Sequence, residues 1–196
     1  MGLRTNLTRL SQPRLDALLA DVAAWHELER DRERPYEREN EAAGARGRCA
    51  PDYGGTADLG YGDLDKAWDA LYFVLDPARR ATDTRYNGAP EPTAPGGAAV
   101  WGWHPMPKVY GPLFDHHPRY NTAEEVAQIA AALNATDFEA ELSAHLDALA
   151  AAYVYTPWLS PPTAQGLDYL RSRFGAMRAF YAEAARHGQA VFVDLG

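Results

Sequence analysis

The stretch "LDYLRSRFGAMRAFYAEAARHGQAVFVDL" (167–195) predicts a long amphipathic helix followed by a strand. Over about 163–187, apolar residues recur at the spacing of one helix face, namely Leu167, Leu170, Phe174, Met177, Tyr181 and Ala184. Gly188 can adopt the left-handed conformation that commonly ends a helix. The segment 189–195 is apolar enough for a central strand. This part of the chain therefore predicts a helix joined to the middle of a sheet.

A second helix is predicted over 122–134 from its start signal and its apolar face. Thr122 and Glu125 form a T-x-x-E capping box, in which each side chain accepts a hydrogen bond from a backbone amide at the helix start. Val126, Ile129 and Leu133 follow at helical spacing. A further helix is expected over about 137–150.

Two earlier helices and two strands complete the predicted elements. One helix begins at about Gln12 and extends through a charged segment (26–40) in which Pro35 ends or kinks it; its apolar face is Leu15, Leu18, Leu19, Val22 and Trp25. The other helix covers 63–75, with Asp63 or Asp65 accepting from its first amides. Strands are expected over 3–10 and 98–103.

Composition restricts the class of protein. The 196 residues suit one domain with a sizeable core, and we expect no secretory signal and no membrane-spanning run. Cys49 is the single cysteine, which fits a reducing cytoplasm. A net charge of −8 argues against a general nucleic-acid binder. The expectation is a soluble cytoplasmic protein.

Three stretches resemble a known family: "LDKAWDALYFVL" (64–75), "RYNTAEEVAQIAAALNATD" (119–137) and the terminal stretch quoted above. They are similar to the YfbM-like bacterial proteins, also called domain of unknown function 1877. The resemblance implies a single α/β domain (1–196), with a small mixed sheet covered by helices in three layers. Tyr72 stands where a histidine is frequent in that family, and the segments 31–60 and 78–97 differ from typical members. For function the resemblance implies little.

The segment "DHHPRYN" (115–121) is the first candidate site. His116 and His117 are adjacent and point apart in an extended chain, so they converge poorly on one metal ion, and we predict no metal site. Arg119 precedes the helix start, where free amides favour an anion, although Glu125 already occupies those amides. The segment is expected to be a polar loop with Arg119 as its one plausible anion seat.

Other candidate binding residues are Asp65 and Lys66 at a helix start, and Trp101, Trp103 and His104 at the end of the strand over 98–103. An Asp–Lys pair can tune a proton donor, but helix capping alone explains Asp65. The two tryptophans would share one strand face and line a pocket with His104, or simply be core residues. The Pro- and Gly-rich segment 78–97 is either a lid or a mobile loop.

No serine-hydrolase, Walker, dinucleotide-binding or calcium-loop pattern occurs in the chain. Two functions therefore remain. The favoured one is a small-ligand or protein-binding module without catalysis, with no cofactor and an unknown partner. The alternative is a small enzyme with a pocket lined by His, Arg and Trp side chains, closed by loops.

Overall fold

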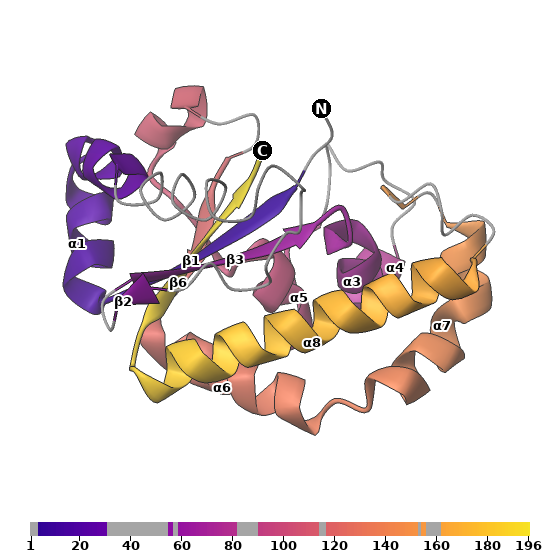
Figure 1. The fold of residues 1–196 in the computed structure, drawn as a ribbon. Helices are drawn as coiled ribbons and strands as arrows, with labels where there is room; N and C mark the ends of the chain where they lie inside the picture. Colours follow the sequence, from indigo (N-terminus) through magenta and orange to yellow (C-terminus); the bar gives the residue numbers. More distant parts are fainter. Residues whose placement is uncertain are drawn as a thin grey trace, which may run out of the picture.

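A six-stranded sheet separates two groups of helices in the computed structural model (Figure 1). The structure describes residues 4–30, 55–56, 59–81, 90–113, 117–152, 154–155 and 162–196. The strand order is β2-β3-β1-β6-β5-β4. The strands are β1 (Thr5–Leu10), β2 (Gly55–Thr56), β3 (Leu59–Asp65), β4 (His104–Pro105), β5 (Arg119–Asn121) and β6 (Ala190–Leu195).

The expected single α/β domain with a helix-covered sheet is confirmed. Each strand pair within the described residues is antiparallel, so this part of the sheet has no parallel pair of the kind that a mixed sheet contains. β6 pairs with both β1 and β5, which confirms its predicted central place. In the described segments no helix is long and apolar enough to cross a membrane.

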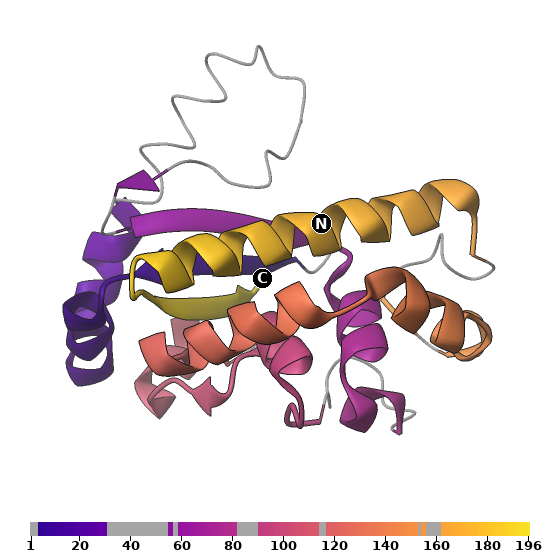
Figure 2. The same cartoon turned by 90° about the horizontal axis from the view of Figure 1, so that it is seen from below.

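Alternation along the strands divides the core in two. Leu7, Val191 and Val193 point to one face, where they pack with α3 (Trp68–Leu75), α5 (Pro95–Trp101), α6 (Ala123–Ala135), α7 (Phe138–Ala151) and α8 (Ala164–Arg186). On this face α6 and α8 lie side by side, and α7 continues beyond the end of α6 (Figure 2). Leu10 and Phe192 point to the other face, beneath α1 (Gln12–Ala20) and a helix over 23–30.

The predicted helices over 122–134, 137–150 and 163–187 are confirmed as α6, α7 and α8. The capping box is present in α6, because Glu125 N donates to Thr122 Oγ1 and Glu125 accepts from Thr122 N. The N-terminal strand is also confirmed as β1. The helix predicted from Gln12 is interrupted, since α1 ends at Ala20 and a separate helix follows over 23–30. Pro35 lies outside the described residues.

Two local predictions were wrong. The segment 98–103 is not a strand: α5 begins with Pro95 in its first turn and ends at Trp101, where Gly102 takes a φ of 76°. The helix predicted over 63–75 begins only at Trp68, because Leu59–Asp65 is strand β3. Asp63 and Asp65 therefore lie at the end of a strand, and neither accepts from the first amides of α3.

The remaining short helices are α4 (Pro77–Arg80) and the 3₁₀ helix η2 (Lys108–Leu113). α4 follows α3 directly, and Asp76 between them accepts hydrogen bonds from Ala78 N and from the segment at 93–94. Of the two segments expected to vary in the family, the residues 31–54, 57–58 and 82–89 lie outside those that the structure describes. Whether 78–97 acts as a lid stays a prediction.

Candidate functional site

The antiparallel pair β4–β5 places a histidine beside a tyrosine at the edge of the sheet. His104 is paired with Tyr120 and Pro105 with Arg119, so His104 and Tyr120 share one face while Arg119 points to the opposite one. The ring centroids of His104 and Tyr120 are 5.1 Å apart, with the planes inclined at 33°. The sheet therefore holds the imidazole against an aromatic neighbour.

Glu125 at the start of α6 fixes the same imidazole from another direction. Its Oε1 lies 2.6 Å from His104 Nε2, and its Oε2 accepts from Thr122 N at 2.8 Å and from Thr122 Oγ1 at 3.0 Å. The carboxylate thus takes part in the capping box and also contacts the His104 imidazole. The His104 side chain remains 44% exposed, against 23% for Glu125. We call His104, Tyr120 and Glu125 the His104 site.

The electrostatics of the His104 site favour an ionised carboxylate. Burial by itself would raise the pKa of Glu125, but hydrogen bonds from the Thr122 backbone and from His104 outweigh burial and hold this pKa below its ordinary value. Burial, with a contribution from the Glu125 charge, raises the pKa of Tyr120. At neutral pH Glu125 is therefore an anion and Tyr120 a neutral phenol.

Arg119 belongs to strand β5 rather than to the predicted polar loop, because its backbone pairs with both β4 and β6. Its side chain is buried, and it donates from Nε to Gly102 O at 2.9 Å and from Nη2 to Trp103 O at 2.7 Å. Its guanidinium also pairs with Glu91, with Nη1 3.0 Å from Oε1. The predicted anion seat is thus occupied by groups of the chain itself, and anion binding at Arg119 stays a prediction.

The other predicted histidines do not join the His104 site. His117 is exposed, and its Nε2 lies 2.6 Å from Met106 O. His116 lies outside the described residues. Within the described segments there is no group of three or more His, Cys, Asp or Glu side chains that could hold a metal ion. The structure brings His104 together with Glu125 and Tyr120, whereas His117 contacts the backbone carbonyl of Met106.

Trp101 and Trp103 lie on either side of a helix end and do not share a strand face. Trp101 ends α5 and stacks on Trp68 and Tyr72, with centroid distances of 5.8 Å and 6.0 Å. Trp103 follows Gly102, and its backbone N donates to Asn121 Oδ1 at 2.8 Å. The predicted shared face is wrong because it assumed a strand. Trp101 packs against the large core, which is the core alternative considered above.

Asp65 and Lys66 form a second polar cluster at the turn between β3 and α3. Asp65 has a φ of 50°, a left-handed conformation that Asp tolerates better than most residues. Its carboxylate accepts from Arg4 Nε and from Tyr169 Oη, each at 3.0 Å, and Lys66 N donates to Tyr169 Oη at 3.2 Å. These partners anchor the turn to Arg4, which directly precedes β1, and to Tyr169 of α8.

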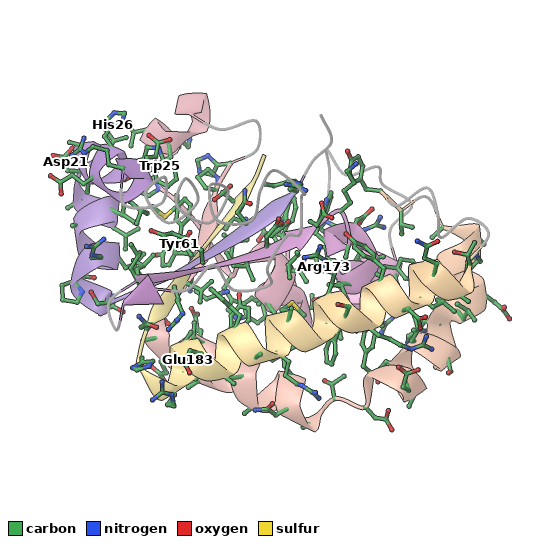
Figure 3. All side chains as sticks on the ribbon, in the orientation of Figure 1. Asp21, Trp25, His26, Tyr61, Arg173 and Glu183 are labelled. Atoms are coloured by element: carbon green, nitrogen blue, oxygen red, sulfur yellow. The ribbon has the colours of Figure 1, made fainter. Side chains whose placement is uncertain are left out.

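Arg173 and Asp63 complete this cluster. Arg173 reaches from α8 towards the end of β3 (Figure 3), where Nη1 donates to Asp63 O at 3.1 Å and Nη2 lies 3.6 Å from Asp65 Oδ2. Burial raises the pKa of Asp63, although the Asp65 amide and the Arg4 charge oppose this rise. Since its charged groups are paired with one another, the cluster holds the turn between β3 and α3 against α8.

An Asp63→Asn variant is expected to gain stability relative to the parent as pH rises. Because the folded chain raises the pKa of Asp63, it binds this proton more tightly than the unfolded chain does. The Asp63 contribution is therefore fully present below the ordinary pKa of about 3.8 and lost as pH rises through the raised pKa. Asparagine keeps an acceptor for the Asp65 amide and does not ionise.

Urea unfolding of the parent and Asp63→Asn at a series of pH values measures this difference. Asp168→Asn is the control, since the Asp168 side chain is 75% exposed. If the difference in free energy of unfolding between Asp63→Asn and the parent stays constant from acid to neutral pH, folding does not raise the pKa of Asp63.

A hollow lies elsewhere, between α1 and the helix over 23–30. Figure 3 labels Trp25 and His26 on this helix. The hollow is lined by Arg14, Ala17, Leu18, Ala24, Glu27 and Leu28. None of these residues was a predicted site residue. The hollow and the His104 site are therefore separate features.

Sequence reasoning missed Tyr120 and the second role of Glu125. The sequence predicts Glu125 only as a capping residue, because the capping box is a local signal within four residues. Its contact with His104 joins positions 21 residues apart. No local signal for that contact exists, since it depends on the register of β4 against β5 and on where α6 starts.

The fold and the site define a small α/β protein in which helices cover both faces of an antiparallel sheet. A family model, domain of unknown function DUF1877, matches residues 1–193, and the chain belongs to this family. The fold is similar to that of YfbM from Escherichia coli, a protein of unknown function, with a TM-score of 0.58 and 14% sequence identity. That similarity covers 98% of this chain and 99% of YfbM. No curated protein matches the chain.

Proposed function

We propose that this chain is a bacterial cytoplasmic protein that binds a small ligand at the His104 site without catalysing a reaction. The observation that carries the proposal is the 2.6 Å contact between His104 Nε2 and Glu125 Oε1, made by an imidazole whose side chain remains 44% exposed. An imidazole held in one orientation loses little conformational freedom on binding, and preorganisation of this kind favours ligand recognition.

The described surface suits a small ligand better than a partner protein. Stable protein interfaces contain a buried apolar centre, and large exposed apolar patches often mark such sites. Among the described residues, Val109 is the one large hydrophobic side chain that is exposed, at 55%. The net charge of −8 argues against nucleic acid. These observations favour a ligand that reaches a few polar groups.

A small enzyme is the second candidate, and the His104–Glu125 pair is the observation that favours it. A carboxylate that orients an imidazole is the arrangement of many general bases. The predicted pocket, however, combined this histidine with Arg119, whose side chain lies on the opposite face of the sheet and donates to Glu91 and to backbone carbonyls. Turnover of a bound compound by the parent, lost in His104→Ala, would establish the enzyme.

Polar fragments that stabilise the parent against heat are expected to lose this effect in a His104→Ala variant. A ligand at a hundred times its Kd stabilises the folded state by about 2.7 kcal/mol, and a shift of that size is readily measured. His145→Ala is a matched control, because His145 Nε2 lies 3.5 Å from Glu141 Oε2 within α7. If every fragment acts equally on the parent and His104→Ala, the ligand does not bind at the His104 site.

A further inference from the structure

The proton arrangement on His104 follows from the chemistry of its partner. An ionised carboxylate only accepts hydrogen bonds, and the lowered pKa of Glu125 keeps it ionised at neutral pH. At 2.6 Å from this carboxylate, Nε2 must carry the proton that is donated. In the neutral imidazole the other nitrogen, Nδ1, is then left with a lone pair that accepts.

Glu125 is not free to rotate away from the histidine. Its second oxygen accepts from both Thr122 N and Thr122 Oγ1, so the capping box of α6 fixes the carboxylate. On the other side, the Tyr120 ring lies against the imidazole. Within the described part of the chain, His104 makes no hydrogen bond, ion pair or ring contact besides these two. The imidazole of His104 thus presents Nδ1 as an acceptor in a fixed orientation.

The charges around His104 select against an anionic ligand. Glu125 carries a negative charge at hydrogen-bond distance, and the exposed Glu124 precedes it in the first turn of α6. The nearest basic side chain along β5, Arg119, points to the opposite face of the sheet. A neutral donor group therefore suits Nδ1 of His104 better than a carboxylate or a phosphate does.

We propose that the ligand of the His104 site is a neutral planar ring compound that donates an O–H or N–H hydrogen bond to His104 Nδ1. This inference rests on the proposed ligand-binding function. The ring of the ligand packs on the exposed imidazole beside Tyr120, since offset and tilted aromatic contacts are favourable. The donor hydrogen bond sets its orientation. Glu125 acts as a positioning residue, because it contacts the histidine and not the ligand.

Three probes test this chemistry: phenol, which offers a ring and a donor; anisole, which offers the ring without the donor; and benzoate, which offers a ring with a negative charge. Binding is measured in mildly alkaline buffer by NMR, from the ring nitrogen resonances of the histidines. The expected results are a protonated Nε2 and an unprotonated Nδ1 in His104, and binding of phenol about tenfold tighter than anisole, as one hydrogen bond provides. Phenol should shift the Nδ1 resonance of His104.

Matched variants separate the donor contact from the aromatic contact. His104→Phe keeps a ring and removes the acceptor, so phenol and anisole should bind it equally. Glu125→Gln retains a capping-box side chain but no longer fixes the proton on Nε2, so the preference for phenol should shrink. His145→Phe should leave the preference unchanged.

The outcomes distinguish this inference from the proposed function. Equal binding of phenol and anisole by the parent, or a preference for benzoate, would overturn the ligand class while ligand binding at His104 stands. A proton found on Nδ1 of neutral His104 would overturn it as well. If no probe perturbs His104 and the fragments of the thermal experiment also act independently of His104, the proposed function itself fails.

Discussion

An Arg79→Ala variant is expected to lose about 3–5 kcal/mol of its free energy of unfolding, because it leaves a carboxylate buried without its counter-ion. Arg79 donates to Asp69 from Nε at 2.8 Å and from Nη2 at 3.1 Å, and the two side chains are only 2% and 1% exposed. Tyr155 N also donates to Asp69 Oδ2 at 2.8 Å. The pair thus joins α3, α4 and the segment after α7.

Urea denaturation measures this loss, and two variants control for it. Arg171→Ala removes an exposed arginine that pairs with Glu139 and Asp168, and should change the stability by no more than about 1 kcal/mol. An Asp69→Leu/Arg79→Met double variant should be more stable than Arg79→Ala, because it removes both buried charges. If Arg79→Ala is no less stable than Arg171→Ala, the buried pair does not contribute as we infer.

The helices that could be predicted are those whose signals are local. The capping box at Thr122 and Glu125 involves residues three apart, and the apolar face of α8 repeats within one segment. Both patterns are independent of the remainder of the chain. For the same reason the ends of α6 and α8 were predicted to within about one residue.

Strand β3 could not be predicted from its sequence, because it contains glycines that are explained only by the side chains packed against them. A Cβ at Gly60 would lie 2.2 Å from Arg9 Nε, and one at Gly62 would lie 2.9 Å from a ring carbon of Phe180. These glycines therefore serve tertiary contacts, although strand interiors usually disfavour glycine. The strand predicted over 98–103 was wrong for a different reason. A short run of small and apolar residues suits either a strand or a buried helix.

The candidate site could be predicted only in part, because its residues come from different elements of the fold. His104 was named from its type and its neighbours, whereas its partners Tyr120 and Glu125 come from β5 and α6. Arg119 was named as well, but the pairing of β4 with β5 turns it to the other face. Which side chains converge is decided by register and by alternation, and neither is visible in a single short motif.

A Phe174→Ala variant is expected to lose about 3–5 kcal/mol of its free energy of unfolding, the range for buried aromatic residues. Phe174 is 4% exposed in the middle of α8, and its ring stacks on Phe138 of α7 with the centroids 4.2 Å apart and the planes at 7°. Removing the ring leaves a cavity between two helices that contact each other through it. Leu71→Ala and Val193→Ala test the same core from α3 and β6 and should each lose about 2–5 kcal/mol.

Thermal and urea unfolding of these variants measures how much the core stabilises the fold that positions the His104 site. Val109→Ala is the control, since Val109 is 55% exposed and its loss should stay within about 0.5 kcal/mol. Phe174→Leu should lose less than Phe174→Ala, because a leucine side chain fills part of the cavity. α6 packs on α8 and carries Glu125, so a loosened α8 should also weaken the contact between Glu125 and His104. Variants of Leu71, Phe174 and Val193 that all unfold within a degree of the parent would show that this core is wrongly assigned.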